Sequence, residues 1–365
     1  MIAVIRGTGA SLPETRLTNA ELERRVATTD DWIVTRTGVR ERRVLGDGEA
    51  TSDMAVRAAR AALGMAGRPA EELDLIVVAT VTPDMFTPST ANRVQEKLRV
   101  GRPIPSFDLG AACSGFLYGM DVVCELLRSG RYRSALLIGA ETLTRFTDYQ
   151  DRGSCILFGD GAGAVLLEAA EESEGGVLAS TLKADPQFWD LIRIPGGAAA
   201  RPPSPYVLTQ REVYLRMEGR QVFKLAVQSL EQVAHDTLEQ VGWEIDEVDH
   251  VVLHQANRRI LNAVAERLGL PERKRPTNLH RTGNTGAASI PILLDECQRA
   301  GRFRPGDRVL MLSFGAGITW AGVALRWALE PGELEWSLDG SPRALGVSSA
   351  RASYRPLSRR RRGSV

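Results

Sequence analysis

Three side chains suited to acyl transfer come directly or shortly after predicted buried strands. Cys113 follows the apolar run 104–109 and precedes a stretch with helical spacing of apolar residues. His254 comes directly after another apolar run, and Asn284 lies in a glycine-containing loop before a further helical stretch. In α/β proteins, ligands gather at the carboxyl ends of the strands. We therefore expect the three side chains to converge on one pocket.

The position of Cys113 at a strand-to-helix turn favours a reactive thiolate. Free backbone N–H groups and the positive end of the helix dipole stabilise negative charge there. A lowered pKa makes the thiol a better nucleophile near neutral pH. Small neighbours leave room for a substrate at the sulfur, namely Ala111, Ala112, Ser114 and Gly115. The alternative is that Cys113 is a small buried hydrophobe, as most free cysteines are.

His254 and Asn284 supply groups that a developing negative charge requires. A Cys–His pair permits nucleophilic acyl transfer, and a neutral imidazole and an amide can both donate hydrogen bonds to an oxyanion or enolate. Taken alone, each residue has an ordinary explanation, as a hydrogen-bonded core histidine and as a turn asparagine. The chemical interpretation depends on all three residues meeting.

Alternating strands and helices must position these side chains. Continuous apolar runs predict buried strands at 3–6, 75–80, 104–109, 134–139, 248–253 and 308–313, with a last strand from 323. Helices are predicted at 52–65, 91–98, 114–127, 215–241 and 258–268, with one more ending near 299. Thr18 and Glu21 form a capping-box pattern, so a further helix begins near Asn19. The segment 188–208 is rich in Pro, Gly and Ala and predicts a long loop.

A faint internal repeat indicates two copies of one α/β unit. The stretch 71–83 resembles 246–258, and 130–142 resembles 301–317 at a similar interval. Chance similarity between buried strands is the alternative. We predict an N-terminal half, 1–172, that carries the nucleophile, and a C-terminal half, 173–330, that carries His254 and Asn284.

The last part of the chain, 331–365, predicts a disordered basic tail. It lacks apolar periodicity, is rich in Ser, Arg, Gly and Pro, and ends near four consecutive arginines, 359–362. Such a tail can bind nucleic acid or acidic lipid, but a solvated end without a function of its own is the interpretation we favour.

The composition is that of an ordinary globular enzyme. The chain has 365 residues, 43% hydrophobic and 25% charged, with a formal net charge of +1. This balance gives no argument for a nucleic-acid or membrane partner. Four cysteines without paired spacing predict neither a disulfide framework nor a zinc site. No stretch has the length of a signal-peptide core or a membrane span, so we expect a cytoplasmic protein. The glycines of FGDGAG lack the other features of a nucleotide-binding loop.

Six motifs in order resemble one enzyme family over about residues 1–330. DLGAACSGF around Cys113, HQANRRI from His254 and GNTGAAS around Asn284 look like the three active-site motifs of β-ketoacyl-acyl carrier protein synthase III. DDWIVTRTGVRERR, DRGSCILFGDGAG and SFGAGITWAG are similar to that family too. The resemblance implies an α/β, thiolase-like fold in which two duplicated halves pack as five layers, αβαβα. It also implies an acyltransferase that starts fatty-acid chains.

The resemblance implies a role for each matching residue of the catalytic set. Cys113 would attack an acyl-CoA thioester, and an acyl carrier protein would then deliver a malonyl thioester. His254 and Asn284 would donate hydrogen bonds to the malonyl thioester carbonyl as carbon dioxide leaves. The enolate would attack the acyl-enzyme and release a β-ketoacyl product. The backbone N–H groups of Cys113 and Ala316 would form the oxyanion hole.

Binding roles follow from the same resemblance. Trp32 would stack on the adenine of CoA, with Arg36 and Arg152 nearby. Phe86 would reach from the partner subunit of a homodimer to an acyl pocket that also contains Leu143, and Lys224 and Arg259 would face the acidic carrier protein. No cofactor, metal, nucleic acid or membrane is implied.

Three features depart from the commonest family pattern. Ala316 replaces a frequent glycine in the oxyanion loop, Gly286 replaces a frequent serine, and the loop at 185–208 looks longer than usual. Two other functions stay open: a related enzyme of secondary metabolism that uses another starter or transfers acyl groups to oxygen or nitrogen, and a non-catalytic partner with the same fold.

Overall fold

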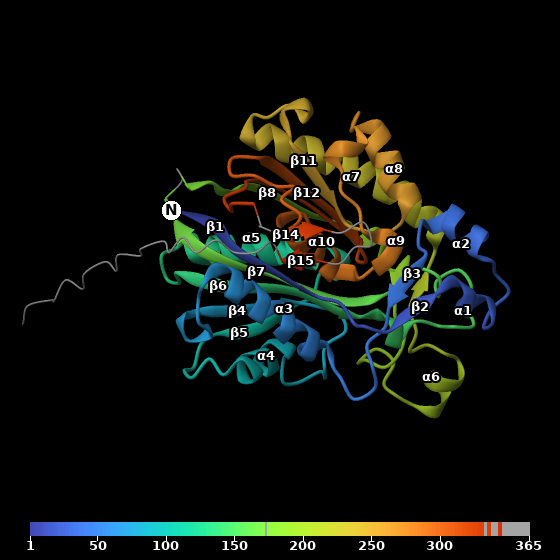
Figure 1. Cartoon of the computed structure of the whole chain (residues 1–365). Helices are drawn as coiled ribbons and strands as arrows, with labels where there is room; N and C mark the ends of the chain where they lie inside the picture. Colours follow the sequence, from blue (N-terminus) through green and yellow to red (C-terminus); the bar gives the residue numbers. More distant parts are fainter. Residues whose placement is uncertain (172–173, 332–333, 337–341, 345–365) are drawn as a thin grey trace, which may run out of the picture.

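Two β-sheets of matching strand order form the framework of the molecule (Figure 1). The computed structural model describes residues 1–171, 174–331, 334–336 and 342–344. The first sheet has the order β1-β7-β6-β4-β5. Its strands are β1 (Ile2–Ser11), β4 (Leu75–Ala79), β5 (Ser106–Leu109), β6 (Ser134–Thr142) and β7 (Asp160–Ala170).

The second sheet has the order β11-β12-β13-β8 and comes from the later part of the chain. Its strands are β8 (Gly176–Ala184), β11 (His250–Leu253), β12 (Arg308–Gly315) and β13 (Thr319–Arg326). In the first sheet β4 pairs with β6 in parallel, and β6 then pairs with β7 antiparallel. In the second sheet β11 pairs with β12 in parallel, and β12 with β13 antiparallel. The repeated sequence segments therefore occupy equivalent strands, which confirms the duplication.

Alternating side chains of each strand pack into different layers. In β4, Leu75 and Val77 belong to the central core, whereas Ile76 and Val78 pack with the helices on the outer face. This alternation with a period of two residues is what a sheet buried on both faces requires. The five layers are helix, sheet, helix, sheet, helix, as expected for the αβαβα fold.

The helices fill the three remaining layers. Between the sheets lie α5 (Gly115–Arg128) and α10 (Ser289–Arg299), whose residues share one core with both sheets. In Figure 1, α3 (Thr51–Ala66) and α4 (Thr90–Leu98) lie below the first sheet, and α7 (Gly219–Val241) and α8 (Arg258–Arg267) lie above the second. The smaller helices are α1 (Asn19–Glu23), α2 (Asp30–Thr37), α6 (Pro205–Thr209) and α9 (Leu279–Thr282).

Several predicted elements differ from the observed ones. Strand β1 is longer than the strand predicted at 3–6. It lies directly against α3, and this close approach requires a glycine, since a Cβ at Gly9 would come within 2.1 Å of the Ala58 oxygen. All four residues of β5 are half-buried, since β5 is an edge strand rather than a fully buried one. Strand β8 was not predicted; its central residues are half-buried because it lies at the sheet edge.

The predicted loop at 188–208 contains short regular elements and continues further along the chain. Strand β9 (Ile192–Arg193) pairs with β10 (Arg216–Met217), and α6 lies between them. Helix α7 consequently begins at Gly219, four residues after the predicted start at 215.

The capping box of Thr18 and Glu21 at α1 is confirmed. Strands β2 (Arg16–Thr18) and β3 (Glu41–Arg43) form a separate antiparallel pair.

The predicted tail, 331–365, lies largely outside the described residues. Within it, β14 (Leu334–Trp336) pairs antiparallel with β15 (Pro342–Ala344). The domain boundaries near 172 and 330 stay predictions, although the first sheet uses residues 2–170 and the second 176–326.

Candidate active site

One cavity of about 780 Å³ contains all three predicted catalytic side chains. Cys113 comes from the first half of the chain, whereas His254 and Asn284 come from the second. Cys113 follows β5, His254 follows β11, and Asn284 lies in the loop between α9 and α10. The convergence that the sequence predicted is therefore observed. The cavity walls are mostly apolar, which favours a substrate with a hydrocarbon part.

Cys113 lies in a tight turn between β5 and α5. The turn is a short 3-10 helix, Ala112–Ser114, and Ala112 has a φ of +47°. A left-handed conformation is uncommon for a residue with a Cβ and concentrates at functional sites. Ser313 of the second sheet donates a hydrogen bond of 2.8 Å to the Cys113 carbonyl oxygen. The Cys113 turn is thus held by both halves of the chain.

The pKa of Cys113 moves in the opposite direction from the sequence-based expectation. Burial raises the pKa of the thiol to about 12, and the nearby Glu141 carboxylate adds to the shift. Removal of water penalises a thiolate more than the helix N-terminus stabilises it. Burial therefore favours the protonated thiol of Cys113, which must lose its proton when the sulfur forms a bond.

The raised pKa of Cys113 leads to a testable prediction for the pH dependence of its alkylation. With a pKa of about 12, the rate of iodoacetamide reaction at Cys113 should rise about tenfold per pH unit from neutral pH upward without a plateau, because only the thiolate reacts. Peptide mass spectrometry after timed alkylation measures this rate, with Cys113→Ser as the blank. A plateau near neutral pH would show that the helix dipole dominates instead.

His254 is neutral, and a hydrogen bond to the neighbouring strand β12 fixes its backbone at the end of β11. Its backbone N–H donates to the Leu312 carbonyl at 2.8 Å, and burial lowers the pKa of the imidazole to about 4. Ser289 Oγ lies 2.6 Å from His254 Nδ1 and also accepts the Gln255 N–H at 3.3 Å. When the Ser289 hydroxyl donates to Nδ1, the ring hydrogen is on Nε2, where it can bind a substrate oxygen.

Asn284 is oriented by its own loop. Its N–H donates to the Leu157 carbonyl at 2.8 Å, and its Oδ1 accepts the Gly286 N–H at 2.9 Å. The amide oxygen is therefore occupied, while Nδ2 has no hydrogen-bond partner among the described residues. Because Asn284 lines the cavity, its Nδ2 is a candidate donor to a substrate oxygen.

The turn between β12 and β13 lies against the nucleophile. A Cβ at Gly315 would come within 2.7 Å of the Cys113 nitrogen, so a glycine is required there. Thr319 Oγ1 lies 3.2 Å from the Ala111 oxygen and 3.1 Å from the Ala316 oxygen, which ties the two segments together. Ala316 lines the cavity and does not have a positive φ. Its Cβ therefore introduces no backbone strain at a position where the resemblance led us to expect glycine.

Glu141 is a cavity residue that the sequence interpretation did not select. This carboxylate is fully buried and accepts hydrogen bonds from Thr82 Oγ1 at 2.6 Å and from the Val81 N–H at 3.2 Å. Burial raises its pKa to about 7. A Cβ at Gly286 would come within 2.9 Å of Glu141 Cγ, and Gly286 has a φ of +56°, which explains a glycine there rather than serine. Glu141 is the penultimate residue of β6 and follows the predicted apolar run 134–139, so the hydrophobic pattern did not indicate this role.

The predicted CoA-binding residues gather at one side of the cavity. The guanidinium groups of Arg36 and Arg152 each lie 4.6 Å from the centre of the Trp32 ring. Trp32 and Arg36 line the cavity, and Arg152 reaches the same place from the loop after β6. Arg220, which the sequence interpretation did not select, also lines it. These groups form a cationic, aromatic entrance.

Of the remaining predicted residues, two line the cavity and two do not. Leu143 is buried and lines it, and Arg259 lines it with its guanidinium 5.6 Å from the Phe223 ring. Lys224 is exposed on α7 and does not line the cavity. Phe86 is also outside the cavity of its own chain and is 83% exposed.

Two features of the described residues bear on other functions. Across 1–171 and 174–331, no group of three or more His, Cys, Asp or Glu side chains is placed to hold a metal ion. Within the same described part, no helix is both long and apolar enough to cross a membrane.

Comparison with known proteins identifies relatives over most of the chain. The model of 3-oxoacyl-[acyl-carrier-protein] synthase III matches residues 107–186, and that of its C-terminal part matches residues 238–327. A β-ketoacyl-[acyl-carrier-protein] synthase III from Erythrobacter litoralis is 47% identical and aligns with 89% of this chain and 99% of its own length.

Solved structures give the same result. The 3-oxoacyl-[acyl-carrier-protein] synthase III from Aquifex aeolicus is 43% identical, with a TM-score of 0.83 over 89% of this chain and all of its own. A priming β-ketosynthase from a polyketide biosynthetic pathway reaches the same TM-score at 32% identity over 90% of this chain and 97% of its own. The ranges matched by the two family models include Cys113, His254 and Asn284.

Proposed function

This chain belongs to the 3-oxoacyl-[acyl-carrier-protein] synthase III family and is a condensing acyltransferase of fatty-acid initiation; from that premise we propose how its residues perform the reaction. The observation that carries the proposal is the single cavity shared by Cys113, His254 and Asn284. It combines a nucleophile with two neutral hydrogen-bond donors. The substrates are an acyl-CoA and a malonyl group on an acyl carrier protein, and no resident cofactor takes part.

In the first half-reaction, Cys113 sulfur attacks the thioester carbonyl of the acyl-CoA. The new sulfur–carbon bond forms, the bond to the CoA sulfur breaks, and the thiol proton ends on the departing CoA. The backbone N–H groups of Cys113 and Ala316 stabilise the oxyanion as an oxyanion hole. A protonated thiol suits this step, since it exchanges one thiol for another without a net change of charge.

In the second half-reaction, the malonyl thioester loses carbon dioxide and its carbonyl oxygen gains negative charge. His254 Nε2–H and Asn284 Nδ2–H donate to that oxygen, and neither donor carries a positive charge. The enolate carbon then attacks the acyl-Cys113 carbonyl. The carbon–sulfur bond breaks, the sulfur takes up one proton from the solvent, and the β-ketoacyl carrier protein leaves.

We assign substrate recognition to the cavity entrance. Trp32 stacks on the adenine of CoA, while Arg36 and Arg152 pair with its phosphates. Lys224 and Arg259, both exposed, face the acidic carrier protein. The protein acts in the cytoplasm as a homodimer in which Phe86 completes the acyl pocket of the partner subunit beside that pocket's Leu143; the exposed position of Phe86 supports this assignment.

The Trp32 assignment predicts a selective defect in CoA recognition. Trp32→Ala should raise the KM for acyl-CoA about tenfold, because base stacking on an aromatic ring contributes about 1–3 kcal/mol, and should leave the KM for the malonyl carrier protein unchanged. Steady-state kinetics with each substrate varied measures both constants. Trp189→Ala, at an exposed aromatic side chain outside the cavity, is the control. Equal losses for both substrates would contradict the assignment.

The mass of the carrier protein after reaction tests the proposed reaction against acyl transfer. With acyl-CoA and malonyl carrier protein, the carrier protein should lose carbon dioxide and gain the acyl group. An acyl group found on an oxygen or nitrogen acceptor, with the malonyl group intact, would favour the alternative acyltransferase of secondary metabolism. Repeating the measurement with a series of acyl-CoAs identifies the starter.

A further inference from the structure

The loop at 80–89 exposes an apolar tip that the reaction chemistry does not use. At the tip, Met85 and Phe86 are 44 and 83% exposed, and Val81 at the start of the loop is 40% exposed. An exposed cluster of large apolar side chains in a soluble protein marks a contact surface. A contact of this kind requires that the tip has a fixed shape, and the polar residues of the loop show how it is held.

At its start, the loop is anchored in the catalytic cavity. Glu141 accepts hydrogen bonds from the Val81 N–H and from Thr82 Oγ1, at 3.2 and 2.6 Å. Thr51 Oγ1, at the beginning of α3, donates to the Thr82 carbonyl at 2.6 Å. Because Val81 also lines the cavity, this end of the loop has a defined position relative to Cys113.

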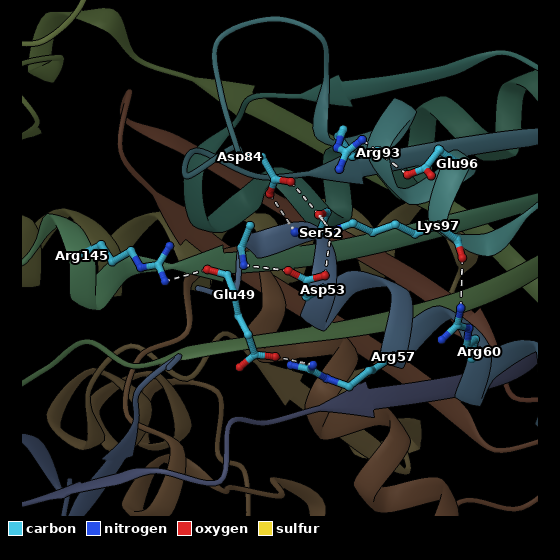
Figure 2. A network of polar contacts seen from close by, with 11 residues as sticks. Glu49, Ser52, Asp53, Arg57, Arg60, Asp84, Arg93, Glu96, Lys97 and Arg145 are labelled. Carbon is cyan, nitrogen blue, oxygen red and sulfur yellow. Dashed lines mark hydrogen bonds and ion pairs between the residues drawn. The ribbon is translucent and has the colours of Figure 1, made fainter. Parts of the chain in front are cut away.

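Beyond Thr82, the loop is held by Asp84 (Figure 2). Asp84 Oδ1 accepts the Ser52 backbone N–H at 2.9 Å, and Oδ2 accepts the Ser52 hydroxyl at 2.6 Å. Ser52 is in the first turn of α3, whose N-cap residue, Ala50, has no side chain that can cap the helix. Asp84 therefore supplies from a distant loop the negative group that a helix N-terminus favours.

The same hydrogen-bond chain continues to α4. Lys97 Nζ donates to Ser52 Oγ at 2.6 Å and to Asp53 Oδ1 at 2.7 Å. Ser52 thus accepts from a cation and donates to a carboxylate, which fixes the direction of its hydroxyl hydrogen. Figure 2 shows Lys97, Ser52 and Asp84 as one connected path, while the Arg93–Glu96 pair on the same helix lies apart from it.

We propose that Asp84 is a positioning residue that sets acyl-chain selectivity by fixing the loop that carries Phe86. This inference rests on the proposed function, in which Phe86 of one subunit closes the acyl pocket of the other. Asp84 does not touch the substrate. It acts through the loop, whose residues 81–84, directly before the tip, are held by Glu141 and Ser52, so that the pocket it closes has a defined length.

Loss of the Asp84 carboxylate tests the proposal through a ratio rather than a rate. In Asp84→Ala, the ratio of kcat/KM for long to short acyl-CoAs should change about tenfold, the scale on which an apolar pocket discriminates chain length. Asp84→Asn, which keeps an acceptor for the Ser52 N–H, should restore part of the wild-type ratio. Lys97→Met should shift the ratio in the same direction while leaving Asp84 in place.

Two further variants keep the test decisive. Glu96→Ala removes an exposed carboxylate of α4 that is paired only with Arg93 and should leave the ratio unchanged. Phe86→Ala should shift the ratio directly, and adding Asp84→Ala to it should cause no further shift. An unchanged ratio in Asp84→Ala, with Phe86→Ala shifted, would overturn this inference alone. An unchanged ratio in Phe86→Ala would overturn the assignment of Phe86 to the acyl pocket and this inference with it.

Discussion

Replacement of Cys113 by alanine should abolish formation of the acyl-enzyme. Incubation of wild-type protein with a suitable acyl-CoA should add one acyl group to the intact mass, and Cys113→Ala should add none. Product formation should fall by about 10⁴-fold or more, the scale on which loss of a covalent nucleophile reduces turnover. The cause is the absence of the one sulfur in the cavity that the thioester can acylate.

The other cysteines provide the control for this experiment. Cys124, Cys155 and Cys297 are free but buried outside the cavity, so Cys297→Ala should acquire the acyl group as wild type does. Thermal unfolding of Cys113→Ala should stay close to wild type, since a small side chain is replaced by a smaller one. Wild-type product formation by Cys113→Ala would show that the nucleophile is another residue.

Removal of either neutral donor should separate the two half-reactions. His254→Ala and Asn284→Ala should each reduce decarboxylation of malonyl carrier protein by about 10²–10³-fold, the cost of losing one oxyanion donor in a water-excluded site. Acylation of Cys113 should survive in both, because the oxyanion hole of the first step uses backbone N–H groups. Intact-mass measurements report acylation, and release of labelled carbon dioxide reports decarboxylation.

Asn284→Asp distinguishes hydrogen-bond donation from shape. The carboxylate is nearly the same size as the amide, but it cannot donate to the enolate oxygen and repels its charge. It should therefore be at least as defective in decarboxylation as Asn284→Ala. Loss of acylation with decarboxylation intact, in either alanine variant, would contradict the assigned roles.

The sequence was sufficient to predict the duplicated fold and the residues that meet in the cavity. Apolar runs such as 134–139 and 248–253 identified β6 and β11, because strands buried on both faces have continuous hydrophobic sequence. The repeat then predicted equivalent strand positions in the two halves. Strand β8 was missed because its half-buried residues lack such a run.

Properties that depend on distant packing were beyond the sequence pattern. The position of Cys113 before a helix suggested a lowered pKa, but the second half of the protein covers the sulfur, so burial raises the pKa instead. Glu141, which lies near Cys113, and Ser289, which contacts His254, are distant from these residues in the sequence and come close to them only in the folded chain. The path from Lys97 to Asp84 joins two helices and a loop that share no sequence periodicity.

The most direct test of the central claim is to follow one acyl group through both half-reactions on the same protein. Wild-type enzyme is first acylated with acyl-CoA, freed of excess substrate, and then mixed with malonyl carrier protein while intact masses are recorded. We predict that the adduct leaves Cys113 as the β-ketoacyl carrier protein appears, and that it persists on His254→Ala. An adduct that leaves wild type as a free acid, or that persists after malonyl carrier protein is added, would contradict the account.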